Sequence, residues 1–152
     1  MLDLDALFDT VEQSAFRLEP VARTGRPVDA SDLAWELPWF EAIRRAVDAG
    51  RVVQRVRVMD RPPSPHQRFE LSLAPFHEQA GEELRILAAS AARELSLPVV
   101  DFWLLDDRRV VTLDDAGAQV TTDPPVVRRM RRYRDLAWQH AVPFARFLDG
   151  RW

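Results

Sequence analysis

The charged residues best placed to bind a ligand lie two positions apart within apolar segments. Arg55 and Arg57 alternate with valines, and Asp101 interrupts the apolar run that contains Trp103. An ionised carboxylate in an apolar setting is costly unless it is paired or hydrogen-bonded. We therefore expect Asp101 either to contact at least one arginine or to lie at the wet edge of a cleft.

A second pair of charged residues, Arg68 and Glu70, flanks a phenylalanine in a short helical segment. Residues two apart do not face each other on a helix, so the two side chains should have different partners. The expected partner is Asp101 for Arg68, and Arg55 or Arg57 for Glu70. These groups fit two interpretations, a structural ion-pair network and a ligand-binding pocket.

Trp103 is expected on the same strand face as Asp101, because side chains two apart on a strand share a face. A polar group beside an aromatic ring is a common small-ligand arrangement, whereas core packing is the plainer role for a tryptophan. If this face is open, the candidate ligand- or partner-binding residues are Arg55, Arg57, His66, Arg68, Glu70, Asp101 and Trp103.

No residue pattern indicates a metal centre, a cofactor or a catalytic nucleophile. The chain has no cysteine, and all 21 basic residues are arginine, so thiolate and lysine mechanisms are both excluded. His77 and Glu78 begin like a zinc-peptidase motif, but Gly81 stands where the second histidine is required. We therefore predict no catalytic residue, no bound metal and no cofactor.

The segment Arg128–Arg134 holds five arginines in seven residues. Arginine binds phosphate with two parallel hydrogen bonds, so this segment could read phosphate groups. The alternative is a solvated helix face. The formal net charge of −3 favours the second interpretation and makes direct nucleic-acid binding unlikely.

Residue periodicity predicts a single α+β domain over residues 1–152, with a mixed, largely antiparallel sheet packed by helices mainly on one face. The expected strands lie near 52–59, 83–88, 99–105, 108–113 and 118–121. The expected helices lie near 3–14, 38–49, 65–74 and 126–148, with an additional short strand considered at 15–19. The long C-terminal helix carries an apolar stripe, and Pro143 should kink or split it.

The sequence has no apolar run near the ~20 residues of a membrane helix, and its first residues are acidic where a signal peptide would be basic. We therefore expect a cytoplasmic protein that does not contact a membrane. A homodimer is compatible with the composition.

The order of several short motifs resembles a known family. The motifs are Ala-Phe-Arg-Leu-Glu at 15–19, Gln-Arg-Val-Arg-Val at 54–58, Pro-x-Ser-x-x-x-Arg-Phe-Glu-Leu at 62–71, Ala-Gly-Glu at 80–82 and Asp-Phe-Trp-Leu-Leu-Asp-Asp at 101–107. This arrangement is similar to an actinobacterial family described as domain of unknown function 6879. One departure is His66, where the family pattern has tyrosine.

The resemblance implies no reaction. Genes of such proteins often lie beside genes for helix-turn-helix regulators, which implies a regulatory or ligand-sensing module that binds such a regulator or a small ligand. The strand and helix order also resembles phospholipase-D-like folds. The His-x-Lys chemistry of those enzymes is impossible without lysine, so the alternative is a hydrolase with a degenerate Arg/Glu/His site.

Overall fold

The computed structural model describes residues 4–21 and 30–150. Among these residues, a single sheet contains seven strands: β1 (Ser14–Glu19), β2 (Val52–Met59), β3 (Glu83–Ala88), β4 (Asp101–Leu105), β5 (Arg109–Asp114), β6 (Gly117–Thr121) and β7 (Val142–Pro143). The helices of the same residues are α1 (Leu4–Asp9), α2 (Ala30–Asp48), α3 (Pro65–Ala80), α4 (Ala89–Glu94), α5 (Pro124–His140) and α6 (Phe144–Leu148).

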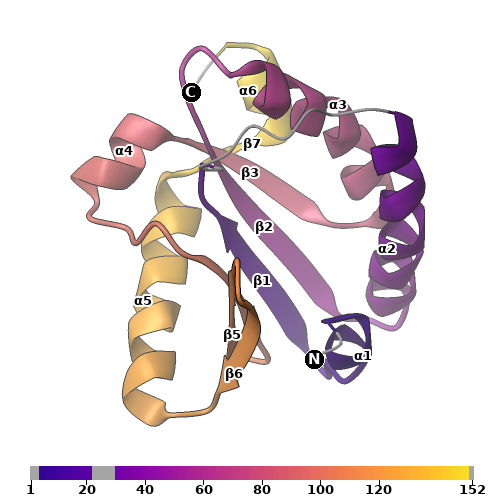
Figure 1. Cartoon of the computed structure of the whole chain (residues 1–152), viewed down its shortest axis with the longest axis vertical. Helices are drawn as coiled ribbons and strands as arrows, with labels where there is room; N and C mark the ends of the chain where they lie inside the picture. Colours follow the sequence, from indigo (N-terminus) through magenta and orange to yellow (C-terminus); the bar gives the residue numbers. More distant parts are fainter. Residues whose placement is uncertain (1–3, 22–29, 151–152) are drawn as a thin grey trace.

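The strand order is β6-β5-β4-β1-β2-β3-β7 (Figure 1). Strands β1, β2 and β3 are parallel neighbours joined through α2 and α3, and the other four pairings are antiparallel. The chain then returns through α4 to place β4 on the other side of β1. These pairings confirm the predicted mixed, largely antiparallel sheet.

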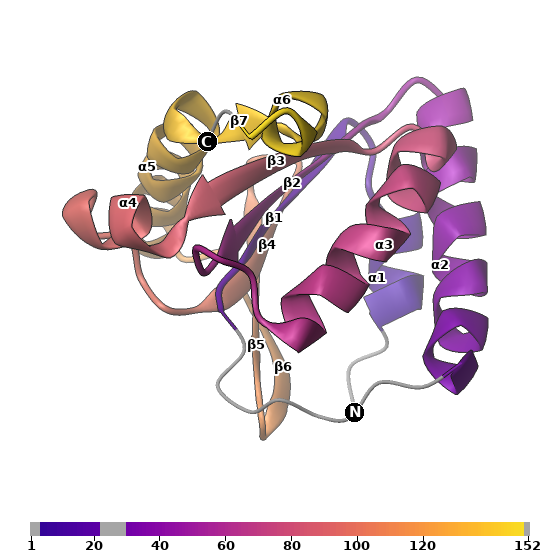
Figure 2. The same cartoon turned by 90° about the horizontal axis from the view of Figure 1, so that it is seen from above.

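Helices cover both faces of the sheet, not mainly one as expected (Figure 2). On one face, α1 and α2 enclose a core that includes Phe8, Ile43 and Trp103. On the other face, α5 packs Met130 and Ala137 against the sheet. The continuous apolar run of β4 explains the difference, because a strand buried on both faces needs no polar alternation.

Strand β2 shows how period-2 alternation places charge inside the fold. Val56 and Val58 face the α5 side, and Val53 faces the α2 side. Arg55 and Arg57 share the face of Val53, because residues two apart point the same way. Both arginines are buried there, so the structure confirms the predicted strand and places its charged face inside the fold.

Helix α3 has a complete N-terminal capping box, in which Ser64 and Gln67 satisfy each other's backbone amides and Pro65 occupies the first turn. The predicted end near Pro75 is wrong, because the helix continues to Ala80. Packing overrides the proline here: Leu73, Ala74 and His77 are buried, while Pro75 itself is exposed.

Other predicted boundaries also move. Helix α2 begins at Ala30 rather than 38. The first helix, α1, ends at Asp9 rather than near 14, and β1 begins at Ser14. Helix α4 was not expected. The predicted break at Pro143 is confirmed: α5 ends at His140, and the two-residue strand β7 separates it from α6.

Within the part of the chain that the structure describes, none of the helices combines the length and apolar character needed to cross a bilayer.

Gly81, which ends α3, provides a test of the packing between α3 and α2. Its φ of 103° is left-handed, and a Cβ there would lie 2.7 Å from Cγ1 of Val47. Gly81→Ala should therefore lower the free energy of unfolding by about 2–4 kcal/mol, from backbone strain plus overpacking.

Gly50→Ala is the matched control. Gly50 has a φ of 86° but nothing within 4 Å of the added Cβ, so only backbone strain of about 1 kcal/mol applies. Urea unfolding of both variants measures the difference. Equal losses of stability would mean that Val47 and Gly81 are not in close contact.

Candidate functional site

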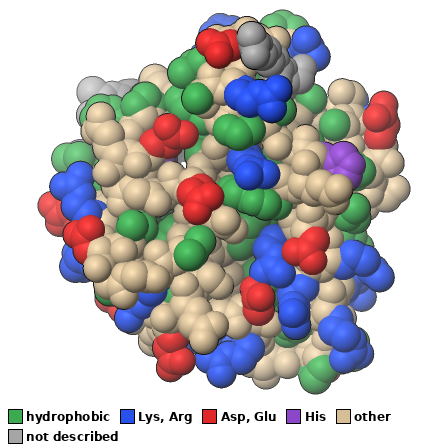
Figure 3. Space-filling model, turned by 180° about the vertical axis from the view of Figure 1, so that it is seen from behind, with side chains coloured by type: hydrophobic (Ala, Val, Ile, Leu, Met, Phe, Trp, Pro, Cys, Tyr) green, Lys and Arg blue, Asp and Glu red, His purple; other side chains and the backbone are tan. Residues whose placement is uncertain are grey.

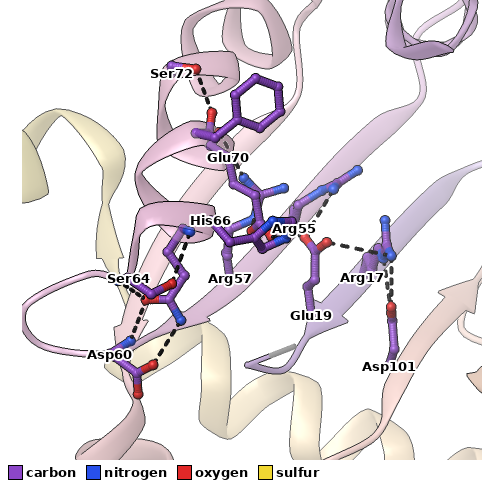
Figure 4. A network of polar contacts seen from close by, with 12 residues as sticks. Arg17, Glu19, Arg55, Arg57, Asp60, Ser64, His66, Glu70, Ser72 and Asp101 are labelled. Carbon is purple, nitrogen blue, oxygen red and sulfur yellow. Dashed lines mark hydrogen bonds and ion pairs between the residues drawn. The ribbon is translucent and has the colours of Figure 1, made fainter. Parts of the chain in front are cut away.

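A cluster of charged side chains extends from the middle of β2 to the carboxyl ends of β1 and β2, on the sheet face that α2 and α3 cover (Figures 2 and 4). Glu19 ends β1, and Asp101 begins the antiparallel β4, so both lie at the same edge of the sheet. The first turns of α3 add His66 and Glu70. In open α/β sheets, ligands bind outside the carboxyl ends of the parallel strands, which makes this cluster the candidate site.

The central contacts of the cluster alternate in charge across the two strands. Arg55 contacts both Glu82, at 2.6 Å, and Glu19, at 3.2 Å. Glu19 also accepts a hydrogen bond of 3.0 Å from Nε of Arg57. Arg57 in turn lies 3.3 Å from Glu70. Each buried charge therefore has an opposite charge beside it.

A histidine stands at each end of this chain of contacts. At the buried end, Nδ1 of His77 lies 2.7 Å from Oε2 of Glu82. At the other end, Nε2 of His66 lies 2.6 Å from Oε1 of Glu70, and the His66 side chain is 29% exposed. The chain of contacts thus runs from the protein interior to the solvent.

Arg17 forms a branch that links the cluster to β4. Its guanidinium donates two hydrogen bonds to Asp101, of 3.0 and 2.8 Å, and lies 3.6 Å from Glu19. The guanidinium carbons of Arg17 and Arg55 lie 5.5 and 5.8 Å from the ring centroid of Trp103. The buried indole ring is thus a cation–π surface for two arginines.

Burial and ion pairing oppose each other in setting the pKa values of the acidic groups. Burial alone would raise the pKa of Glu82, but Arg55 and the His77 hydrogen bond outweigh it and lower that pKa to about 2. Burial likewise opposes ionisation of Glu19, yet Arg17, Arg57 and Arg55 hold its pKa well below the ordinary range. Both glutamates are therefore stable anions at neutral pH.

The pKa values of Glu70 and His77 are shifted in the direction that favours the neutral form of each side chain. Burial raises the pKa of Glu70 despite the nearby Arg57. Burial also lowers the pKa of His77 despite its contact with Glu82. Glu70, with its raised pKa, lies against the imidazole of His66, and carboxyl and imidazole groups are the types of side chain that transfer protons in enzymes.

Two buried nitrogen atoms have no hydrogen-bond partner among the described residues: Nη2 of Arg55 and Nδ1 of His66. Buried polar atoms normally have a partner, so these two are the unsatisfied polar atoms of the cluster. The described residues include no group of three or more histidine, aspartate or glutamate side chains able to hold a metal ion.

The structure brings together most of the predicted site residues. Glu70 contacts Arg57 as expected, and Asp101 does contact an arginine. The predicted pair of Arg68 and Asp101 is wrong, because Arg68 is exposed and donates to the carbonyl of Pro63 instead. On α3, Arg68 and Glu70 point in different directions, and Glu70 is the one that faces the sheet.

Sequence reasoning missed four members of the cluster, Arg17, Glu19, His77 and Glu82. Arg17 and Glu19 carry the same signal as Arg55 and Arg57, charges alternating with apolar residues in a short strand. Glu82 and His77 are five residues apart and meet through the turn that ends α3, and this contact was missed because the helix was expected to end before His77.

Asp106 has a structural role that was also unexpected. Its carboxylate accepts hydrogen bonds of 3.0, 2.7 and 3.0 Å from the backbone amides of Glu12, Gln13 and Ser14. Burial opposes this charge, but the amide hydrogen bonds and Arg109 lower the pKa of Asp106. The carboxylate fixes the start of β1 against the turn between β4 and β5.

Neutralising Glu82 should lower the free energy of unfolding far more than neutralising Asp101. The Glu82 side chain is fully buried and its loss would leave Arg55 undercompensated, so Glu82→Gln should cost about 3–5 kcal/mol of unfolding free energy. Asp101 is 23% exposed and Arg17 retains Glu19, so Asp101→Asn should cost about 1 kcal/mol.

Chemical denaturation of both variants tests this ranking. A fully buried partner would make the loss at Asp101 about 3–5 kcal/mol, and the partial exposure of the Asp101 side chain makes the expected loss smaller. A loss at Asp101 as large as that at Glu82 would contradict the assignment of Arg55 and Glu82 as the central buried pair.

The stability of the protein should fall on acidification through Glu82. Its pKa is about 2 when folded and ordinarily 4.5, so its contribution is complete above pH 4.5 and is lost as the pH falls toward 2. His77 acts in the same direction, because its pKa is lowered from 6.5 and protonation below that pH favours the unfolded chain.

Urea unfolding from pH 2.5 to 7 should therefore give a rising stability curve whose slope below pH 4.5 is reduced in Glu82→Gln. Parallel curves for the wild type and the variant would show that Glu82 does not titrate with a lowered pKa.

One solved structure similar to this chain is that of Nuc from Salmonella typhimurium, a phospholipase D family member. The TM-score is 0.54 at 12% sequence identity, over 91% of this chain and 86% of that chain, a likeness of fold alone. No curated protein matches the sequence. Residues 21–149 match the model of the family described as Domain of unknown function (DUF6879), and the chain therefore belongs to that family.

Proposed function

We propose that this protein is a non-enzymatic, cytoplasmic binding module with a regulatory role. Its partner would be a helix-turn-helix transcription regulator, or a small ligand that alters such a partnership. The gene neighbourhood implied by the family resemblance supports the choice of partner.

The observation that carries the proposal is the mutual pairing of the charged side chains at the candidate site. Arg55, Arg57, Glu19 and Glu82 contact one another, so their charges are largely neutralised within the fold. A cluster of this kind stabilises the fold and leaves few ionisable side chains free to act in catalysis. The unpartnered Nη2 of Arg55 is the feature through which a small ligand would be sensed.

The second candidate function is a hydrolase with a degenerate site. It is favoured by the raised pKa of Glu70 beside His66, and by the likeness of fold to a phospholipase D family member. Against it, lysine is absent from the sequence, so the His-x-Lys pair of that superfamily's enzymes cannot form.

Activity assays separate the two candidates. The purified protein is incubated with phosphodiester and nucleic-acid substrates in the presence of Mg²⁺, Mn²⁺, Ca²⁺ or Zn²⁺, and we expect no turnover. Turnover that disappears in Glu70→Gln or His66→Ala, but persists in the control Arg68→Gln, would overturn the binding-module proposal. Arg68 suits the control because it lies on the same helix but outside the ion-pair cluster.

A direct test is co-expression with the helix-turn-helix regulator encoded nearest to the gene. We expect the two proteins to co-elute in size-exclusion chromatography. Separate elution of two folded proteins would contradict the proposed partnership.

A further inference from the structure

Four arginines on α5, Arg128, Arg129, Arg131 and Arg132, form an exposed surface that we call the arginine face. The opposite side of the helix packs Val127, Met130 and Ala137 into the core. On the side of the molecule drawn in Figure 3, basic side chains gather at the lower right, where α5 lies.

No ion pair within the described residues neutralises the arginine face. Among the described residues, none forms an ion pair or a hydrogen bond with these four side chains, whereas Arg134 on the next turn contacts both Asp107 and Asp135. Arginines three and four positions apart on a helix are neighbours and repel one another. The four arginines also lie in the first half of α5, where the positive end of the helix dipole further disfavours cationic side chains. An anionic partner would remove both costs.

We propose that the arginine face is a docking surface for a carboxylate-rich segment of a protein partner. This inference rests on the proposed function, a module that acts by binding another protein, and it assigns that role to α5 rather than to the ion-pair cluster. Exposed guanidinium groups pair with carboxylates through two parallel hydrogen bonds, which gives such a surface geometric selectivity.

The surroundings of the arginine face favour a protein over a nucleic acid. Exposed carboxylates at Asp123 and Asp135 limit the basic surface at both ends to a short length, which suits a short acidic segment better than a continuous phosphate backbone. The aromatic residues of α5, Tyr133 and Trp138, pack against the core, so the surface lacks rings for base stacking.

The spacing of the arginines also fits a protein segment. Arg128 and Arg132 are separated by about 6 Å along the helix axis, from a rise of 1.5 Å per residue. Acidic residues four apart on a facing helix, or two apart on an extended segment, repeat at about the same distance. A short acidic stretch could therefore contact all four arginines without distortion.

The test uses two fluorescent probes, poly-L-glutamate of about 20 residues and a duplex DNA of 20 base pairs, in binding titrations at low salt. The test variant replaces all four arginines of the face with glutamine, a good helix former. The matched control replaces four exposed arginines elsewhere with glutamine: Arg44, Arg45, Arg93 and Arg146. The two variants therefore have the same net charge.

We expect the wild type to bind poly-L-glutamate more tightly than DNA. The test variant should bind poly-L-glutamate at least about 10-fold more weakly, and the control less than about 2-fold more weakly, from four exposed pairs of a few tenths of a kcal/mol each. Circular dichroism and thermal melting confirm that both variants are folded.

Equal weakening in the two variants would show that net charge alone attracts the probe, and would overturn the proposal. Preference for DNA, lost only in the test variant, would make the surface a nucleic-acid site instead. Failure of the wild type to bind poly-L-glutamate would also overturn it. Co-elution of the regulator with the test variant as well as with the wild type would remove α5 from the interface but leave the proposed function intact.

Discussion

The buried ion pair between Arg55 and Glu82 is the constraint on which the candidate site depends. Only 3% of the Arg55 side chain is exposed and none of Glu82, so neither charge is tolerable without the other. Arg55 comes from the middle of β2 and Glu82 from the loop between α3 and β3, so the pair requires helix and strands to meet in one register. Glu19 and Arg57 extend this compensation to the carboxyl ends of β1 and β2. The cluster therefore exists only in the assembled fold.

Much of the fold could be predicted because its signals are local. The alternating valines identified β2, and the apolar stripe with Pro143 identified α5 and its end. Packing decided what local patterns could not: α3 continues through Pro75 because its second half is buried. At the site, the alternating arginines gave the right residues but not their partners. Asp101 contacts Arg17, which is 84 residues away in the sequence, and short-range spacing contains no information about such a pair.

The likeness to a phospholipase D family member is one of fold, over 91% of this chain. The edge of the sheet where α/β proteins bind ligands is here occupied by side chains that bind each other. Fold alone does not determine function, which depends on the groups that the fold displays. In this chain the groups on display are the unpaired arginines of α5, while the ionisable groups beside β1 and β2 are mostly satisfied within the protein.

The hydrogen bonds from Glu12, Gln13 and Ser14 to Asp106 have a consequence for folding during synthesis. Strand β1 lies in the middle of the sheet, yet its neighbour β4 and the carboxylate that fixes its first residues are made about ninety residues later, as the separation of 92 between Ser14 and Asp106 shows. During synthesis β1 can pair with β2 early, but its other edge stays open until β4 has left the ribosome. Such late closure of an open strand edge exposes a chain to misassociation, so β1 is open to pairing with other chains until β4 emerges.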